Sequence, residues 1–155
     1  MGTKQEQKPG CCGGPPCVKH EPMISVVIPA LDAERHLGRT LAALVPAAVD
    51  GLVREVIVVD GGSSDATLKI ADDAGAQIVR APRGRGGQLK AGAAAARFPW
   101  LLFLHADTVL EPGWFAEAEE FIERVTEGRR APAAGVFRFV LDDEGVVPRL
   151  VERGA

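Results

Sequence analysis

The sequence has no excess of positive charge and no long hydrophobic run. The formal net charge of the 155 residues is −3, so the chain lacks the basic field that nucleic-acid binding usually needs, and we expect neither DNA nor RNA as its main partner. Apolar runs such as "WLLFL" are far shorter than the roughly 20 residues of a membrane-spanning helix, and the N-terminus lacks the apolar core of a signal peptide. We therefore expect a cytoplasmic protein with no transmembrane segment.

Cysteine is scarce and confined to one short stretch. All three cysteines lie in "CCGGPPC" at Cys11, Cys12 and Cys17. Their odd number and the surrounding glycine and proline argue against a disulfide framework. A metal-binding or redox tail would need further ligands, and no second ligand cluster follows. We predict that residues 1–22 form a flexible Cys/Gly/Pro-rich leader, in which the role of the cysteines stays open.

From Met23 onward, short apolar runs alternate with segments of helical periodicity. With 46% hydrophobic and 25% charged residues, residues 23–155 have the balance of one globular domain. Apolar runs separated by helices are typical of parallel strands buried on both faces and joined by right-handed crossovers. We predict an α/β, Rossmann-like domain in which Asp32 caps the first helix. The expected strands are 24–30, 55–60, 76–81, 100–105 and 135–141, and the expected helices are 31–44, 64–74, 86–97 and 111–125.

Acidic residues follow three of these strands. Asp32 comes after the first strand, Asp60 and Asp65 after the second, and Asp107 after the fourth. In open parallel sheets, ligands bind at the carboxyl ends of the strands where the strand order reverses, and an order of 3-2-1-4 would make these loops neighbours. Clustered carboxylates repel one another unless their pKa values rise or a cation binds. Hard oxygen ligands favour Mg²⁺ or Mn²⁺.

The third strand leads instead into a basic, glycine-rich helix start. Arg80, Arg83, Arg85 and Lys90 surround "GRGGQLK", and guanidinium groups beside a helix N-terminus suit a phosphate. The segment is neither a dinucleotide-binding fingerprint nor a Walker loop. An acidic rim and a basic loop together predict a site for a metal-bridged diphosphate.

Each of these residues also has an ordinary structural interpretation. Asp32 and Asp65 are typical helix caps, and Asp60 before "GGSS" is typical of an Asx-turn. His105 is equally consistent with a strand-end histidine whose hydrogen bonds are satisfied. The arginines alone would suit a solvated face. Their joint placement at consecutive strand ends is what favours a binding site.

The stretch from about Ile24 to Phe121 resembles glycosyltransferase family 2 enzymes of the GT-A fold, and three of its segments follow one another as they do in that family. "SVVIPALDAERHL" is similar to the opening strand and helix, "EVIVVDGGSSDAT" to the nucleotide-binding segment, and "LLFLHADT" to the strand that carries the D-x-D metal motif. The combination of "DGGSSD", "GRGGQLKAGAAAA" and "HADT" most resembles the bacterial radical-SAM/selenodomain-associated (arsenosugar-type) transferase subgroup.

The resemblance implies a nucleoside-diphosphate sugar as donor and Mg²⁺ or Mn²⁺ as cofactor. It implies Asp60 near the base or ribose, Arg83 and Arg85 near the diphosphate, and Asp107 on the metal. Three positions depart from the family pattern. Gly61 replaces the usual second aspartate of V-D-D, His105 replaces the first acid of D-x-D, and Lys90 replaces the asparagine more usual in its helix. The full implied donor-binding set is Pro29, Ala30, Asp32, Glu34, Asp60, Gly61, Arg83, Arg85, His105 and Ala106, with Asp107 as the metal ligand.

Family members continue beyond the equivalent of Ala155, through an acceptor-binding half and an acidic general base. We therefore expect a GT-A domain that is incomplete at its C-terminus. No good candidate for the base is found, because Asp142, Asp143 and Glu144 have the pattern of a turn. A truncated sheet leaves an uncovered edge and an uncovered apolar face, which predicts self-association or pairing with a separate acceptor-binding half.

The leading interpretation is a metal-assisted, inverting glycosyltransferase, of which this chain holds the donor-binding half. The alternative is a non-catalytic nucleotide-binding or interaction module derived from the same fold. A phosphoacceptor receiver domain fits less well, because the third strand ends in arginines rather than an acid. A nucleotidyltransferase would have the same type of fold and would also use a metal. It would carry a glycine-rich loop after the first strand, whereas this sequence has "PALDAE" there.

Overall fold

The computed structural model describes residues 23–128 and 133–137. The chain divides into two compact units, with the boundary between Glu111 and Pro112. The predicted leader, residues 1–22, and the acidic segment 142–144 lie outside the described residues.

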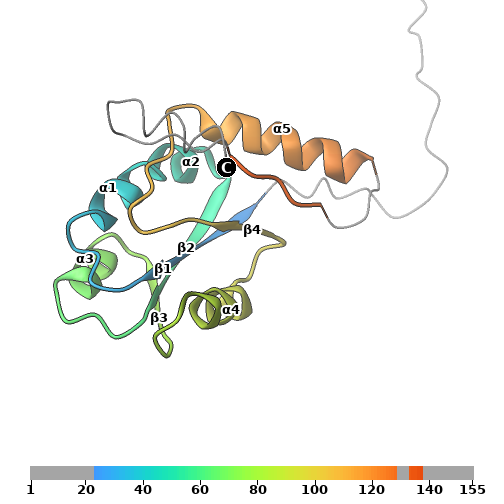
Figure 1. The fold of residues 1–155 in the computed structure, drawn as a ribbon. Helices are drawn as coiled ribbons and strands as arrows, with labels where there is room; N and C mark the ends of the chain where they lie inside the picture. The colour runs from blue at the N-terminus through green and yellow to red at the C-terminus, as the bar shows by residue number, and fades with distance from the viewer. Residues whose placement is uncertain (1–22, 129–132, 138–155) are drawn as a thin grey trace, which may run out of the picture. The chain divides into compact units, whose positions relative to one another are not determined.

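The first unit is built on a parallel sheet of four strands (Figure 1). The strands are β1 (Ile24–Ala30), β2 (Val53–Asp60), β3 (Gln77–Arg80) and β4 (Trp100–Phe103), in the order β3-β2-β1-β4. The parallel α/β fold predicted from the sequence is confirmed. The observed order is the 3-2-1-4 arrangement under which the loops after the first, second and fourth strands become neighbours. Because the chain runs outward from β1 to β3 and then returns to β4, the order reverses between β1 and β4.

Helices cover both faces of this sheet. The helix α4 (Arg85–Ala95) packs on β1, β2 and β3. In the chain, α1 (Leu37–Ala42) and α2 (Val45–Asp50) lie between β1 and β2, and α3 (Thr67–Asp73) lies between β2 and β3. Figure 1 shows α4 on one side of the sheet and α1 and α2 on the other. No helix among the described residues has the length and apolar character needed to cross a membrane.

The core explains the unbroken apolar runs of β1 and β2. Side chains that point to both faces of the sheet, such as Val27 and Ile28, are fully buried, as expected where helices cover both faces. Gly92 allows α4 to approach closely: a Cβ there would collide with Val27 and lie 2.9 Å from the Cγ2 atom of Val59.

The segment between β1 and β2 differs from the prediction. One helix was expected over 31–44 with Asp32 as its cap, but α1 begins only at Leu37, its N-cap is His36, and no side chain caps it. Asp32 adopts a positive φ of 46° and serves a different purpose, described below. A second helix, α2, follows with Pro46 in its first turn, where the missing proline N–H has no helical partner to lose.

The second unit contains α5 (Trp114–Glu127), which the sequence placed at 111–125. It starts later than expected, after Gly113 with a φ of 89°. Trp114 is buried and meets Phe137 edge-to-face at a centroid distance of 6.1 Å. Residues 135–137 of the predicted final strand are not in a strand, and residues 138–141 lie outside the described part of the chain.

Candidate functional site

An open cleft of about 280 Å³ lies at the carboxyl ends of β1 and β4, beside the start of α4. This is the point at which the strand order reverses, where ligands bind in open α/β sheets. The lining residues are Pro29, Ala30, Leu31, Asp32, Ala33, His36, Arg85, Gln88, His105, Ala106 and Asp107.

The loops after β1 and β2 are tied together through Asp32. Its carboxylate accepts hydrogen bonds from the backbone N–H of Ser64 at 2.8 Å and from the Ser64 hydroxyl at 3.2 Å. In return, the backbone N–H of Asp32 donates to the Ser63 hydroxyl at 3.0 Å. These contacts hold Asp32 in its positive-φ conformation, so this residue links two loops instead of capping α1.

A second set of hydrogen bonds extends this link. The backbone N–H of Ala33 donates to the hydroxyl of the buried Thr67 at 2.8 Å. Glu34 donates its backbone N–H to the Asp65 carboxylate at 3.0 Å, and the Glu34 carboxylate accepts from the backbone N–H of Ala66 at 3.1 Å. Asp65 also accepts from the backbone N–H of Thr67, the first residue of α3. Glu34 and Asp65 therefore organise the loops beside the cleft and do not line it.

Asp60 ends β2 as a buried carboxylate. It accepts the backbone N–H groups of Gly62 at 3.1 Å and Ser63 at 3.0 Å, which is the Asx-turn considered from the sequence. Burial on its own would raise the pKa of Asp60, but hydrogen bonds from Ser63 and Gly62 and the positive charge of Arg80 outweigh it and hold the pKa below its ordinary value. The ionised carboxylate shapes the β2–α3 loop.

The floor of the cleft contains a polar side chain that the sequence analysis did not single out. Gln88 of α4 is buried, and its side-chain amide donates to the carbonyl oxygens of Ala30 at 2.9 Å and Val59 at 2.8 Å. Gly61 packs directly beside this amide. The signal available in the sequence was a lone glutamine in a helix otherwise rich in glycine and alanine.

The loop after β4 carries the D-x-D-like segment. The N–H of Leu104 continues the pairing to the Val27 carbonyl at 3.0 Å, and the buried Thr40 hydroxyl of α1 donates to the Ala106 carbonyl at 2.8 Å. These two bonds fix the loop backbone. The side chains of His105 and Asp107 stay exposed and line the cleft.

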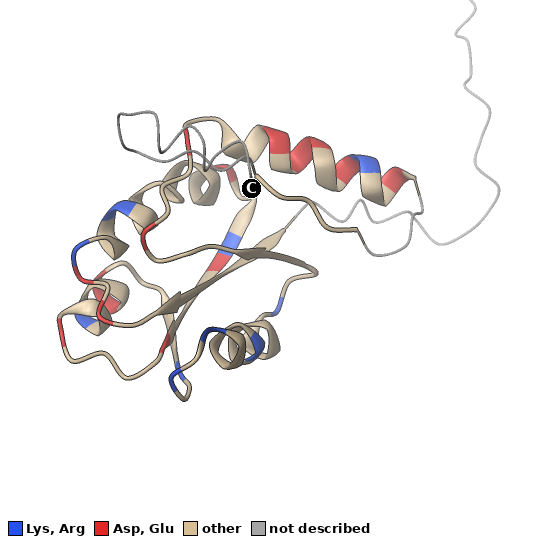
Figure 2. Cartoon of the chain, in the orientation of Figure 1, with Lys and Arg blue, Asp and Glu red and all other residues tan. Residues whose placement is uncertain are grey.

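Basic residues gather at the β3–α4 loop and at the start of α4 (Figure 2). Arg85 lines the cleft, whereas Arg83 and Lys90 do not. Among the residues that the structure describes, no hydrogen bond or ion pair to the Arg85 side chain is found. Its guanidinium is therefore available to a ligand.

A metal ion would find few ligands in this cleft. Within residues 23–128 and 133–137, no group of three His, Cys, Asp or Glu side chains is close enough to hold one. Asp107 supplies a carboxylate and His105 an imidazole at the rim. A divalent cation here would need oxygen atoms from a ligand to complete its coordination.

Seven of the eleven residues predicted as site residues line the cleft, and four do not. The cleft brings together Pro29, Ala30, Asp32, Arg85, His105, Ala106 and Asp107. The four outside its lining are Glu34, Asp60, Gly61 and Arg83. The lining residues missed from the sequence are Leu31, Ala33, His36 and Gln88.

Comparison with known proteins identifies relatives of one kind. The chain is 38% identical over 118 residues to an uncharacterised glycosyltransferase of Mycobacterium tuberculosis, covering 73% of this chain and 51% of the relative. It is 39% identical over 95 residues to the glucosyl-3-phosphoglycerate synthase of Mycolicibacterium paratuberculosis, covering 56% of this chain and 29% of that enzyme. The chain thus spans about half the length, or less, of these relatives.

Solved structures show the same fold. A glucosyl-3-phosphoglycerate synthase from Mycobacterium tuberculosis, in complex with Mn²⁺, UDP and phosphoglyceric acid, superposes with a TM-score of 0.51 and 34% identity, over 56% of this chain and 34% of that one. The same enzyme has been solved with Mg²⁺ and UDP. The parallel sheet flanked by helices is therefore the GT-A, Rossmann-like arrangement.

The family model that matches the chain is "Glycosyl transferase family 2", over residues 25–147. This match begins at the second residue of β1 and includes the other three strands and the whole lining of the cleft. The chain belongs to glycosyl transferase family 2.

Proposed function

We propose that the cleft binds the diphosphate of a nucleoside-diphosphate sugar, and that the chain is the donor-binding part of a metal-assisted, inverting glycosyltransferase. One observation carries the proposal: the cleft joins the carboxylate of Asp107, after β4, to the guanidinium of Arg85, at the start of α4. A cation held by an acid and a direct positive charge can together neutralise a diphosphate. The UDP found in complexes of the related synthase supports this choice of ligand.

Asp107 and His105, at the rim of the cleft, are the side chains that would hold Mg²⁺ or Mn²⁺. Asp107 would hold the ion through a hard oxygen ligand, with His105 beside it. Because the described residues offer no third acidic or histidine ligand, the diphosphate oxygens would complete the coordination. When bound, the ion would stabilise the charge of the departing diphosphate. Metal affinity should then depend on the nucleotide.

The chain's own side chains have distinct tasks in this account. Arg85 binds the phosphates and neutralises part of their charge. The hydrogen bonds among Asp32, Ser63 and Ser64 keep the loops after β1 and β2 in place before a ligand arrives, which lowers the cost of ordering these loops on binding. Inversion also needs a carboxylate to take the acceptor proton, and that group is not assigned among the described residues.

Three finer assignments accompany the proposal. UDP is the first nucleotide to test, because it occupies the related synthase, although Gly61 stands where the family usually places an aspartate. Membership of the radical-SAM/selenodomain-associated subgroup stays a prediction that depends on the "DGGSSD", "GRGGQLKAGAAAA" and "HADT" segments. A cytoplasmic location likewise stays a prediction.

We also propose that β4 pairs with another chain or with a separate acceptor-binding half. Within the described residues, β4 pairs only with β1. Leu101 and Phe103 of β4 are 39% and 48% exposed, and Phe103 is aligned with Val27, whose side chain faces α4. An exposed apolar strand edge favours association. Light scattering of the folded chain tests this, and a strict monomer at high concentration would contradict self-association.

Calorimetric titration tests the donor site. The folded chain is titrated with UDP, GDP and their sugar conjugates, first with Mn²⁺ and then with a chelator. Metal-dependent binding of one nucleotide, and no binding of Mn²⁺ alone, is expected. If a demonstrably folded sample binds none of them, the donor-site proposal fails and the non-catalytic interaction module becomes the better account.

A further inference from the structure

Gln88 connects the carboxyl ends of β1 and β2, beside the point where the strand order reverses. Its side-chain amide bridges the carbonyl of Ala30, the last residue of β1, and the carbonyl of Val59, the next-to-last residue of β2. The residue is 5% exposed, so these bonds are shielded from water. A buried amide that donates to two carbonyl oxygens fixes the local geometry, because leaving the amide itself without partners is costly.

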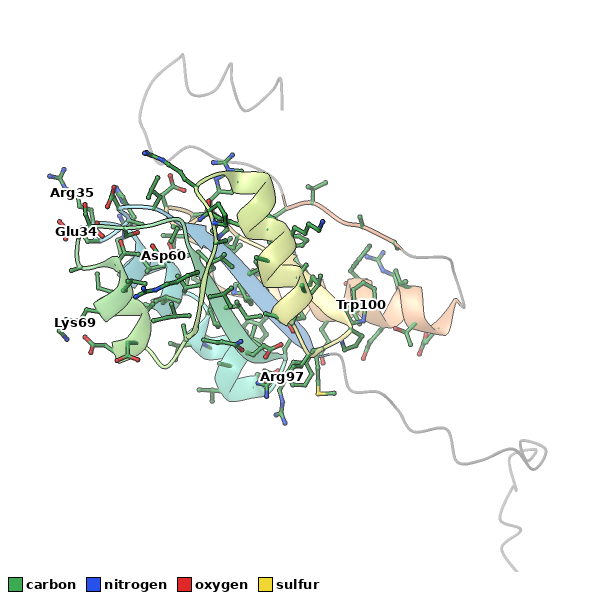
Figure 3. All side chains as sticks on the ribbon, turned by 90° about the horizontal axis from the view of Figure 1, so that it is seen from below. Glu34, Arg35, Asp60, Lys69, Arg97 and Trp100 are labelled. Atoms are coloured by element: carbon green, nitrogen blue, oxygen red, sulfur yellow. The ribbon has the colours of Figure 1, made fainter. Side chains whose placement is uncertain are left out.

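Other contacts already attach α4 to the sheet. Gly92, in the middle of the helix, packs against Val27 and Val59. Beyond its C-terminus, Arg97 binds the Glu55 carboxylate through its backbone N–H and its Nε. Figure 3 shows Arg97 toward the opposite end of the sheet from Asp60. Gln88 is therefore placed to determine where the first turn of α4 lies, rather than whether the helix docks.

That first turn carries Arg85, which lies three residues before Gln88 and so on the same side of the helix. Both side chains line the cleft. Arg85 is exposed, and no contact of its side chain to the described residues holds it. The position of its backbone is therefore the main constraint on where its guanidinium can reach.

We propose that Gln88 is a positioning residue for the phosphate-binding part of the cleft: by bridging the ends of β1 and β2 it sets the first turn of α4, and with it Arg85, at the distance that a diphosphate requires. The identity of the ligand rests on the proposed function above. Gln88 itself touches neither the nucleoside nor the metal in this account.

Gly61 leaves no room for a larger side chain beside the bridging amide of Gln88. Its backbone N–H also donates to the Ala30 carbonyl at 2.9 Å. A Cβ at position 61 would lie 3.1 Å from Nε2 and 3.3 Å from Cδ of Gln88. Any side chain at position 61 must therefore push against the bridging amide, which gives a second way to disturb it.

Gln88→Leu removes the amide at similar volume, and Arg85→Ala removes the guanidinium. With Mn²⁺ present, each variant should weaken UDP binding about tenfold, the scale of one charge-assisted bond, while uridine binding stays within about twofold of wild type. The double variant should bind UDP no more than about twofold more weakly than Arg85→Ala alone, because Gln88 acts through Arg85. Additive losses, or equal losses of uridine and UDP, would overturn the proposal.

Gln88→Glu provides a conservative rescue. A protonated carboxyl group can donate to one of the two carbonyls, whereas an ionised one would face two carbonyl oxygens with no proton to give. The UDP affinity of Gln88→Glu relative to wild type should therefore recover as the pH is lowered. A ratio that does not change with pH contradicts a hydrogen-bonding role.

Amide hydrogen exchange without any ligand separates this inference from the proposed function. Gln88→Leu should speed exchange at residues 88 and 89 by on the order of tenfold, the scale of one hydrogen bond, and leave Gly92 to Ala95 unchanged. Gly61→Ala should do the same to a smaller extent. If hydrogen exchange changes in this way but the chain binds no nucleotide, the structural role of Gln88 is supported and the donor-site proposal fails. Exchange unchanged in the first turn of α4 would overturn the bridge itself.

Discussion

The Glu55 carboxylate accepts hydrogen bonds from the backbone N–H of Arg97 at 2.6 Å and from its Nε at 2.8 Å. It also accepts from the Ser25 hydroxyl at 2.7 Å. Burial on its own would raise the pKa of Glu55, but the hydrogen bonds from Arg97 and Ser25 and the charge of Arg97 together lower it. The connection between α4 and β4 is thereby held to β1 and β2.

This contact predicts acid sensitivity with a definite sign. Because the folded-state pKa of Glu55 is below its ordinary value of 4.5, its contribution to stability is complete above that pH and is lost as the pH falls through the lowered pKa. Glu55→Gln should lower the free energy of unfolding by about 1–3 kcal/mol at neutral pH. The variant should also lose less of its stability than wild type as the pH falls. Urea unfolding across pH measures both.

A matched control is available at the surface. Lys69 and Asp73 form an exposed pair at 2.6 Å on α3. Asp73→Asn should change stability by less than about 0.5 kcal/mol, as exposed helix pairs usually do. If Glu55→Gln and Asp73→Asn change the free energy of unfolding equally, the buried Glu55–Arg97 contact does not stabilise the fold as proposed.

Gly92 predicts a packing effect on α4. Gly92→Ala should destabilise the chain by about 1–3 kcal/mol, because the new methyl group meets Val27 and Val59. Gly38→Ala, in α1, meets nothing within 4 Å and should be neutral or up to about 1 kcal/mol stabilising, since alanine favours helix. Thermal unfolding compares the pair, and equal melting temperatures would count against close approach at Gly92.

The hydrogen bond from Ala33 to Thr67 should link the order of the loops after β1 and β2 to ligand binding in the cleft. Thr67→Val keeps the shape but removes the hydroxyl that the Ala33 N–H donates to, which should cost about 1–3 kcal/mol of stability and weaken UDP binding. Thr67→Ser keeps the hydroxyl and should keep the UDP affinity. If serine and valine weaken UDP equally, the hydroxyl does not organise the loops.

The sequence was informative wherever one strong pattern decided the structure. The unbroken apolar runs of β1 and β2 predicted buried parallel strands, and the acids at the strand ends predicted where the cleft lies. Asp32 was misassigned because a capping pattern is local, while its partners Ser63 and Ser64 lie about thirty residues away and meet it only in the fold. Gln88 was missed for the same reason, since both of its acceptors are backbone carbonyls that no sequence pattern marks.

The helix boundaries show the same limit. The periodicity of 31–44 indicated a helix, but the hydrogen bonds of residues 32–34 to the neighbouring loop delay its start to Leu37. Pro46, in the first turn of α2, was not taken as the start of a new helix. Tertiary contacts overrode local propensity at the edge of the cleft, where the functional prediction depended on them.

The most direct test of the account is the UDP affinity of Asp107→Asn, measured by calorimetry with Mn²⁺ and then with a chelator. The exposed Asp72→Asn on α3 is the matched control, because it removes the same charge outside the cleft. We expect Asp107→Asn to lose at least about tenfold in affinity with Mn²⁺ and nothing with the chelator, because only the metal-bridged contact is removed, while Asp72→Asn matches wild type. An Asp107→Asn chain that still binds UDP with wild-type, metal-dependent affinity would contradict the assignment of this cleft as the metal-assisted donor site.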